Sequence, residues 1–211
     1  MLGAAVAARL HVGGEAAGLA GFLDARQIGR AVLVGNSLGG ATALVSAAAH
    51  PERVAALVLV APASPEMSVP WPVRALRARL SGEIALALAA KPFVAFGLRR
   101  RLYARASRVT EQAIDDAWFP LTVPGTRRAA LAAIRSDPRS HAGVERTIRV
   151  PTLIVWGAED RLILPREGER LVARIPGSRL VMIPDAGHLP QREQPEAFSR
   201  AVADFLSSLS L

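Results

Sequence analysis

Residues 31–44 constrain the fold of this chain more than any other stretch. They read as a short apolar run, a glycine-serine turn and a helix of small residues, with the pattern G-x-S-x-G at residues 35–39. The outer glycines of that pattern are expected to allow close backbone packing on both sides of a tight, strained turn, which lifts a serine hydroxyl clear of the sheet. The following helix directs N–H groups and its positive dipole end to the same place. We therefore predict a nucleophile at Ser37 and an oxyanion donor at the Leu38 N–H.

Polar residues also stand directly after two further apolar runs. Asp160 follows the run at residues 152–156, and His188 follows the run at residues 179–183. Because the carboxyl ends of parallel strands meet at one edge of a sheet, both residues are predicted to lie near Ser37. A serine needs a base to take its proton, an imidazole can do so near neutral pH, and a carboxylate fixes the imidazole tautomer. The order Ser, Asp, His along the chain is the order associated with a serine at such an elbow.

Each of these residues also has a structural interpretation. Ser37 could be incidental to a glycine-rich turn, Asp160 could be a surface acid, and His188 could be a loop histidine with satisfied hydrogen bonds. Glu66 is the alternative acid, since it lies in the loop after another apolar run. The other histidines are assigned no catalytic role: His11, His50 and His141. His50 stands at a helix end, where a cation interacts favourably with the helix dipole, so it has a structural interpretation.

Buried apolar runs alternate with helical stripes, which is typical of an α/β fold with a parallel sheet. Residues 61–150 differ, because prolines punctuate them and their apolar spacing is helical. We therefore predict a core in two parts, residues 1–60 and 151–211, with a helical insertion between them. The sheet of about four strands is predicted from four apolar runs, at residues 31–34, 54–60, 152–156 and 179–183.

The composition excludes several classes of protein. With 211 residues, of which 51% are hydrophobic, the chain can form a domain with a substantial core. It has no cysteine, which excludes a disulfide scaffold, a thiolate zinc site and a cysteine nucleophile. No cluster of residues has metal-ligand spacing, and residues 35–40 lack the lysine of a phosphate-binding loop, so we expect neither a metal nor a cofactor.

The net charge of +8 would suit nucleic acid or an anionic membrane. The arginines are scattered, however, and only residues 99–101 form a run, so we expect a solvated basic surface and no nucleic-acid partner. Residues 1–10 lack a basic signal-peptide start, and no stretch reaches the ~18 apolar residues of a membrane span. We expect a cytoplasmic protein without stable membrane insertion. Peripheral membrane contact by residues 84–98 is the alternative, and the oligomeric state stays open.

Three of these segments together resemble the alpha/beta hydrolase family. They are the elbow at residues 35–40, the acid loop at residues 156–160, and the histidine loop at residues 185–188 followed by residues 194–198. The resemblance implies a catalytic triad of Ser37, His188 and Asp160, and it implies that residues 61–150 form a helical cap. Family members with a serine nucleophile hydrolyse esters, thioesters, amides, lactones or activated C–C bonds. The chain is therefore expected to hydrolyse a small, largely apolar ester or related acyl compound.

Two alternatives accompany this expectation. Asn36 and residues 41–44 resemble the elbow of hydrolases that cleave meta-ring-fission diketones, although Leu189 stands where those enzymes usually carry tryptophan. A C–C bond hydrolase is thus one alternative. The other is a non-catalytic or impaired protein on the same fold, since a fold does not imply its function.

The chain departs from the family before the elbow. The family begins with about four strands ahead of it, including a loop that supplies the second oxyanion donor. No such segment precedes Ala31, so we predict a truncated core whose elbow strand lies at an open sheet edge. We also expect the natural protein to start upstream of Met1. The loss of one oxyanion donor can cost ~10² to 10³ in rate.

Overall fold

The computed structural model describes residues 12–63, 82, 90–135 and 142–209. Its centre is a sheet of four strands in the order β1-β2-β3-β4, in which all neighbours run parallel. The predicted α/β class and the parallel sheet of four strands are confirmed for the described residues. The strands lie close to their predicted ranges: β1 (Ala31–Asn36), β2 (Val54–Val60), β3 (Thr152–Gly157) and β4 (Arg179–Ile183).

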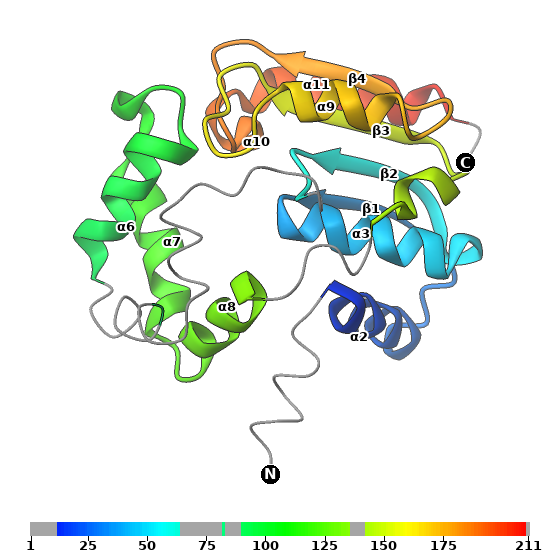
Figure 1. Ribbon diagram of the computed structural model, residues 1–211, viewed down its shortest axis with the longest axis horizontal. Helices are drawn as coiled ribbons and strands as arrows, with labels where there is room; N and C mark the ends of the chain where they lie inside the picture. Colours follow the sequence, from blue (N-terminus) through cyan, green and yellow to red (C-terminus); the bar gives the residue numbers. More distant parts are fainter. Residues whose placement is uncertain (1–11, 64–81, 83–89, 136–141, 210–211) are drawn as a thin grey trace.

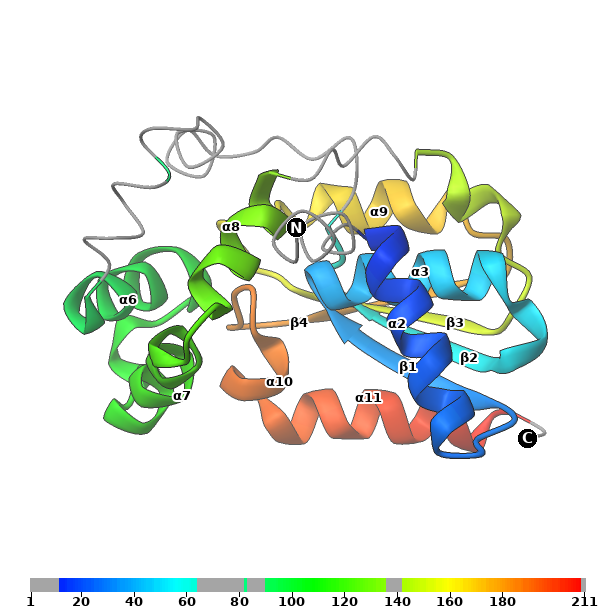
Figure 2. The same ribbon diagram turned by 90° about the horizontal axis from the view of Figure 1, so that it is seen from below.

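Helices cover both faces of this sheet (Figures 1 and 2). One face packs against α3 (Leu38–Ala49) and α9 (Arg166–Val172), with α2 (Val12–Ala25) lying against α3, and the other packs against α11 (Pro195–Ser207). Strand β2 shows why both layers are needed. Its side chains alternate between the two cores, with Leu57 and Leu59 in the first and Val58 and Val60 in the second. A strand buried on both faces reads as a continuous apolar run, as this one does.

Strand β1 lies at one end of the strand order. Within the part of the chain that the structure describes, it pairs with β2 alone. Val34 is 56% exposed, although the adjacent residue Leu33 points to the opposite face and is buried in the core on the α3 side of the sheet. The predicted position of the elbow strand at a sheet edge is therefore confirmed.

A second group of helices lies between β2 and β3 in the chain and beside the carboxyl ends of the strands in space (Figure 1). We call them the inserted helices. They have a core of their own, which includes Leu98, Tyr103 and Ile114. Their described elements are α6 (Lys91–Gly97), the π-helical turn η2 (Leu98–Leu102), the short η3 (Ala106–Arg108), α7 (Glu111–Thr122) and α8 (Thr126–Arg135).

The inserted helices differ from the sequence prediction at one point. Apolar spacing predicts a helix over residues 93–106, but the helical segment ends at Leu102, because Tyr103 is extended, with φ −99° and ψ 143°. The sequence also predicts Thr110 as the N-cap of the helix that follows it. This prediction is confirmed, since its side chain accepts a hydrogen bond from the Ala113 N–H. Apolar spacing predicts two further helices, over residues 73–80 and 83–90. The first lies outside the described residues, as does most of the second.

Two further differences concern helices. Helical apolar spacing over residues 15–25 predicts Phe22 on the buried face of the first helix, but Phe22 is 56% exposed. Ala16 and Leu23 are seven residues apart and share the buried face, whereas Phe22 is rotated by about 100° from Leu23. The short helix α10 (Pro190–Glu193) was not predicted. None of the helices in the described ranges combines the length and the apolar character needed to cross a membrane.

The elbow after β1 depends on two glycines. A Cβ atom on Gly35 would lie 2.3 Å from the Gly39 carbonyl oxygen, and one on Gly40 would lie 2.8 Å from Pro62 Cβ. A Cβ on Gly39 would meet no atom within 4 Å. The prediction that both outer glycines of the pattern pack closely is thus wrong for Gly39, because the backbone approaches α3 one residue further along.

This packing gives a test on adjacent glycines. Gly40→Ala is expected to lower the free energy of unfolding by about 1–3 kcal/mol, because the new methyl group overlaps the chain at Pro62. Gly39→Ala is expected to be neutral or stabilising, since alanine favours a helix over glycine by roughly 1 kcal/mol and there is room for it. Urea denaturation followed by circular dichroism measures both changes. Equal destabilisation by the two variants would contradict the packing argument.

Candidate active site

Ser37 occupies a strained turn between β1 and α3. Its φ of 54° and ψ of −117° are uncommon for a residue with a side chain. Backbone hydrogen bonds hold it in place: its N–H donates to the Val60 carbonyl at 2.9 Å, and its carbonyl accepts from the N–H groups of Ala41 and Ala63. Strain of this kind persists only where the surroundings enforce it, and it concentrates at functional positions. The strand-turn-helix geometry matches the predicted elbow.

The Ser37 hydroxyl takes no part in capping the helix that follows. Serine is a favoured N-cap, yet its side chain makes no capping hydrogen bond here. Leu38 is the first residue of α3, so its N–H is one of those that have no acceptor within the helix. The turn therefore presents a hydroxyl and a helix N-terminus at the same edge of the sheet.

Asp160 and His188 form a buried pair. His188 Nδ1 lies 2.8 Å from Asp160 Oδ2, and each residue is 2% exposed. The second carboxylate oxygen, Oδ1, accepts hydrogen bonds from the N–H groups of Leu162 and Ile163 at 2.8 and 3.0 Å. These bonds fix the orientation of the carboxylate. An acceptor at Nδ1 favours a proton on that nitrogen and leaves the lone pair of the neutral ring on Nε2.

The loops that carry this pair are joined through their backbones. The Ala158 N–H donates to the Ile183 carbonyl, and the Glu159 N–H donates to the Ala186 carbonyl, both at 2.9 Å. Their contact is too close for a side chain at Gly157, where a Cβ would lie 1.9 Å from the Gly187 carbonyl oxygen. The ends of β3 and β4 therefore position Asp160 and His188 as one unit.

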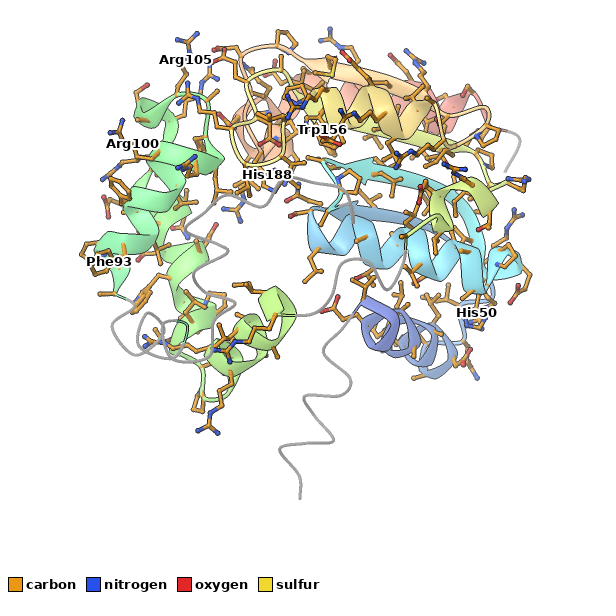
Figure 3. All side chains as sticks on the ribbon, in the orientation of Figure 1. His50, Phe93, Arg100, Arg105, Trp156 and His188 are labelled. Carbon is orange, nitrogen blue, oxygen red and sulfur yellow. The ribbon has the colours of Figure 1, made fainter. Side chains whose placement is uncertain are left out.

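The structure brings Asp160 and His188 together, but it forms no hydrogen bond between His188 and Ser37. His188 Nε2 is buried and lacks a hydrogen-bond partner among the described atoms. A buried nitrogen without a partner is costly and usually has a reason. Figure 3 shows His188 at the end of the sheet that faces the inserted helices.

Asn36 links the elbow to the histidine loop, a role that sequence reasoning missed. Its side-chain amide donates to the Val60 carbonyl at 3.1 Å and to the His188 carbonyl at 3.2 Å. The residue before the serine thus contacts the backbone of the histidine. The sequence signal was an amide side chain at the end of a strand, and it did not reveal a partner 152 residues away.

The inserted helices reach the same loop from the other side. The His188 N–H donates to the Leu102 carbonyl at 2.7 Å. Asp185, which has a positive φ of 56°, forms ion pairs with Arg105 and Arg108. Hydrogen bonds from Arg105 and then Arg108 hold the pKa of the Asp185 carboxyl below its ordinary value. The histidine loop is therefore bound to the sheet and to the inserted helices.

The other residues considered from the sequence lie away from this pair. His50 follows the end of α3, where its Nδ1 lies 3.7 Å from Glu52. Glu66, His11 and His141 lie outside the described residues. In the described ranges, no group of histidine and acidic side chains is arranged to hold a metal ion.

The sequence matches the model of the alpha/beta hydrolase family over residues 3–201. It is 29% identical over 201 residues to 2-hydroxy-6-oxo-6-phenylhexa-2,4-dienoate hydrolase of Burkholderia cepacia. It is 32% identical over 199 residues to 2-hydroxy-6-oxononadienedioate/2-hydroxy-6-oxononatrienedioate hydrolase of Burkholderia vietnamiensis. Each alignment covers 89% of this chain, and the chain spans 66% of the length of each relative.

Solved structures show the same fold. A thermophilic esterase from Thermogutta terrifontis superposes with a TM-score of 0.77 and 26% identity, covering 93% of this chain and 72% of the esterase. Cfl2 from Burkholderia cenocepacia superposes with a TM-score of 0.81 and 23% identity, covering 92% of this chain and 71% of Cfl2. The second likeness concerns the fold alone.

Two adjacent carboxylates provide a test of the buried pair. Asp160→Asn replaces the oxygen that faces His188 Nδ1 with an amide donor, so we expect the free energy of unfolding to fall by about 1–3 kcal/mol. Glu159→Gln removes only partly exposed ion pairs with Arg105 and Arg161, and a change within about 0.5 kcal/mol is expected. Differential scanning calorimetry at neutral pH compares them. Similar losses in both variants would contradict a special role for the Asp160 hydrogen bond.

Proposed function

Because the chain belongs to the alpha/beta hydrolase family, we propose that it is a serine hydrolase of a small, largely apolar ester or related acyl compound. The observation that carries this proposal is the buried hydrogen bond between His188 and Asp160, tied through Asn36 to the strained elbow of Ser37. The relatives and the esterase of similar fold support hydrolysis as the reaction class.

In the proposed reaction, Ser37 Oγ attacks the substrate carbonyl carbon while His188 Nε2 takes its proton. Asp160 keeps the other ring nitrogen protonated and stabilises the imidazolium that forms. The Leu38 N–H donates to the developing oxyanion. His188 then returns the proton to the leaving group as the C–O bond breaks, which leaves an acyl-enzyme. A water molecule, deprotonated by His188, hydrolyses this ester and regenerates Ser37.

We further propose that residues 61–150 form a cap over this site, between core segments 1–60 and 151–211. Their described helices contact the histidine loop through Leu102, Arg105 and Arg108. Leu189, next to the histidine, packs against their apolar cluster. Apolar surroundings of this kind favour a largely apolar substrate.

A second candidate reaction is the hydrolysis of a C–C bond in a diketone. The names of the curated relatives favour it, since they describe hydrolases of 2-hydroxy-6-oxo-dienoates. The elbow with Asn36 before the serine also favours it, whereas Leu189 departs from the tryptophan usual in that group. The remaining alternative is a chain with impaired catalysis.

The nucleophile is tested with a fluorophosphonate probe and p-nitrophenyl esters. Ser37→Ala is expected to abolish labelling and to lower kcat/KM by at least about 10³-fold, because the acyl-enzyme cannot form. Ser46→Ala is the matched control. This serine is buried on α3, the helix that follows Ser37, and its hydroxyl donates to the Thr42 carbonyl, away from the proposed chemistry, so labelling should persist.

The substrate class is tested by comparing p-nitrophenyl esters of increasing acyl length with 2-hydroxy-6-oxo-6-phenylhexa-2,4-dienoate. A higher kcat/KM for esters supports the first candidate, and a higher value for the dienoate supports the second. Well-folded wild-type protein that neither reacts with the probe nor turns over any of these compounds would contradict both.

A further inference from the structure

The carboxylate of Glu193 lies between the histidine loop and the inserted helices. The residue belongs to α10 and is 6% exposed. Its Oε1 accepts a hydrogen bond from the Gly187 N–H, and its Oε2 accepts one from the Ala104 N–H, both at 2.7 Å. Gly187 directly precedes His188, and Ala104 lies between η2 and η3. One side chain therefore joins the backbones of two segments that are far apart in sequence.

The two segments also meet directly. The His188 N–H donates to the Leu102 carbonyl at 2.7 Å. A Cβ on Gly187 would lie 2.6 Å from the Leu102 oxygen and 2.8 Å from the Ala104 nitrogen, so only glycine allows this approach. The backbone of the histidine loop is thus held by a direct hydrogen bond at His188 and by the Glu193 carboxylate one residue earlier.

A carboxylate is a costly side chain to bury in this position. Burial raises the pKa of the Glu193 carboxyl above its ordinary value, although the N–H groups of Gly187 and Ala104, and attraction to Arg108, act in the opposite direction. Because the pKa is raised in the folded protein, the contribution of this carboxyl to the free energy of unfolding is present at low pH. It is lost as the pH rises through the raised pKa. Perturbed carboxyls of this kind concentrate at functional sites.

We propose that Glu193 is a positioning residue whose carboxylate clamps the backbone at Gly187 to segment 102–104 of the inserted helices and thereby sets the His188 imidazole against Asp160. The carboxylate supplies two acceptors at the spacing of two N–H groups, which neither glutamine nor an apolar side chain can do. Because segment 102–104 belongs to the inserted helices, a displacement of these helices is transmitted to the backbone of His188.

The expected effect of Glu193 on catalysis rests on the proposed function. Its expected effect on the position of the His188 imidazole does not, and can be measured separately. The direct reporter is the proton on His188 Nδ1, which is expected to give a downfield ¹H NMR resonance because it is buried and bonded to Asp160. Loss of this resonance in Asp160→Asn identifies it. In Glu193→Gln the resonance is expected to broaden or disappear, and the rate of probe labelling at Ser37 to fall by about 10²-fold, as for a small misplacement of a catalytic group.

Glu167→Gln is the control for the loss of a buried carboxylate. Glu167 lies on α9, is 7% exposed, and accepts a hydrogen bond from Arg170. Its substitution is expected to leave the resonance and the labelling rate unchanged. A folded Glu193→Gln variant with the wild-type resonance would overturn the proposal. If the wild type is not labelled, the proposed function fails, while the resonance still decides whether the clamp exists.

The wild-type protein offers a second test that needs no substitution. The amide protons of Gly187 and Ala104 are expected to titrate together, with one apparent pKa above the ordinary value for glutamate, because they share the Glu193 carboxylate. The neighbouring charged or titratable groups are Asp185, Arg108 and His188. The pKa of Asp185 lies below its ordinary value, which separates its titration from that of Glu193. Any change at His188 is followed through its own ring signals. If the two amide protons titrate with different apparent pKa values, or do not titrate at all, the proposal is contradicted.

Discussion

The hydrogen bond between Asp160 and His188 depends on the parallel register of β3 and β4. In that register Gly157 is the partner of Ile183, so the two strands end together and their loops leave the sheet side by side. A slip of one residue would turn each side chain to the opposite face and separate the loops. Because β1 ends at the same edge, Ser37 is presented there too, and Asn36 joins its strand to the backbone of His188. The site is thus a product of sheet geometry.

The histidine loop is held between two close backbone contacts. On one side Gly157 lets the carbonyl groups of the loop approach β3, and on the other Gly187 lets segment 102–104 approach from the inserted helices. Neither contact leaves room for a Cβ atom. Native packing is dense enough that such contacts transmit displacement, so the setting of His188 reflects both the sheet and the inserted helices. The Glu193 carboxylate links the histidine loop at Gly187 to segment 102–104 at Ala104.

Local sequence signals predicted well those features whose causes are local. The strands follow from apolar runs, the cap at Thr110 from a hydroxyl before a helix, and the strained turn at Ser37 from its flanking residues. The signals failed where the partner is distant in sequence. The close contact of Gly40 depends on Pro62, the extended backbone at Tyr103 adjoins the histidine loop, and the bridging role of Glu193 needs an N–H 89 residues away.

The sequence by itself determined the α/β class and the approximate strands, because periodicity is a property of short segments. It also predicted Ser37, Asp160 and His188 as candidate catalytic residues, because each stands at the end of an apolar run. Tertiary structure alone decided which groups meet. It joined His188 to Asp160, left His188 Nε2 without a partner among the described atoms, and placed the Glu193 carboxylate between loop and helices. These are contacts across long sequence separations, and they exist only once the sheet register and the packing of the inserted helices have fixed the distances between backbones.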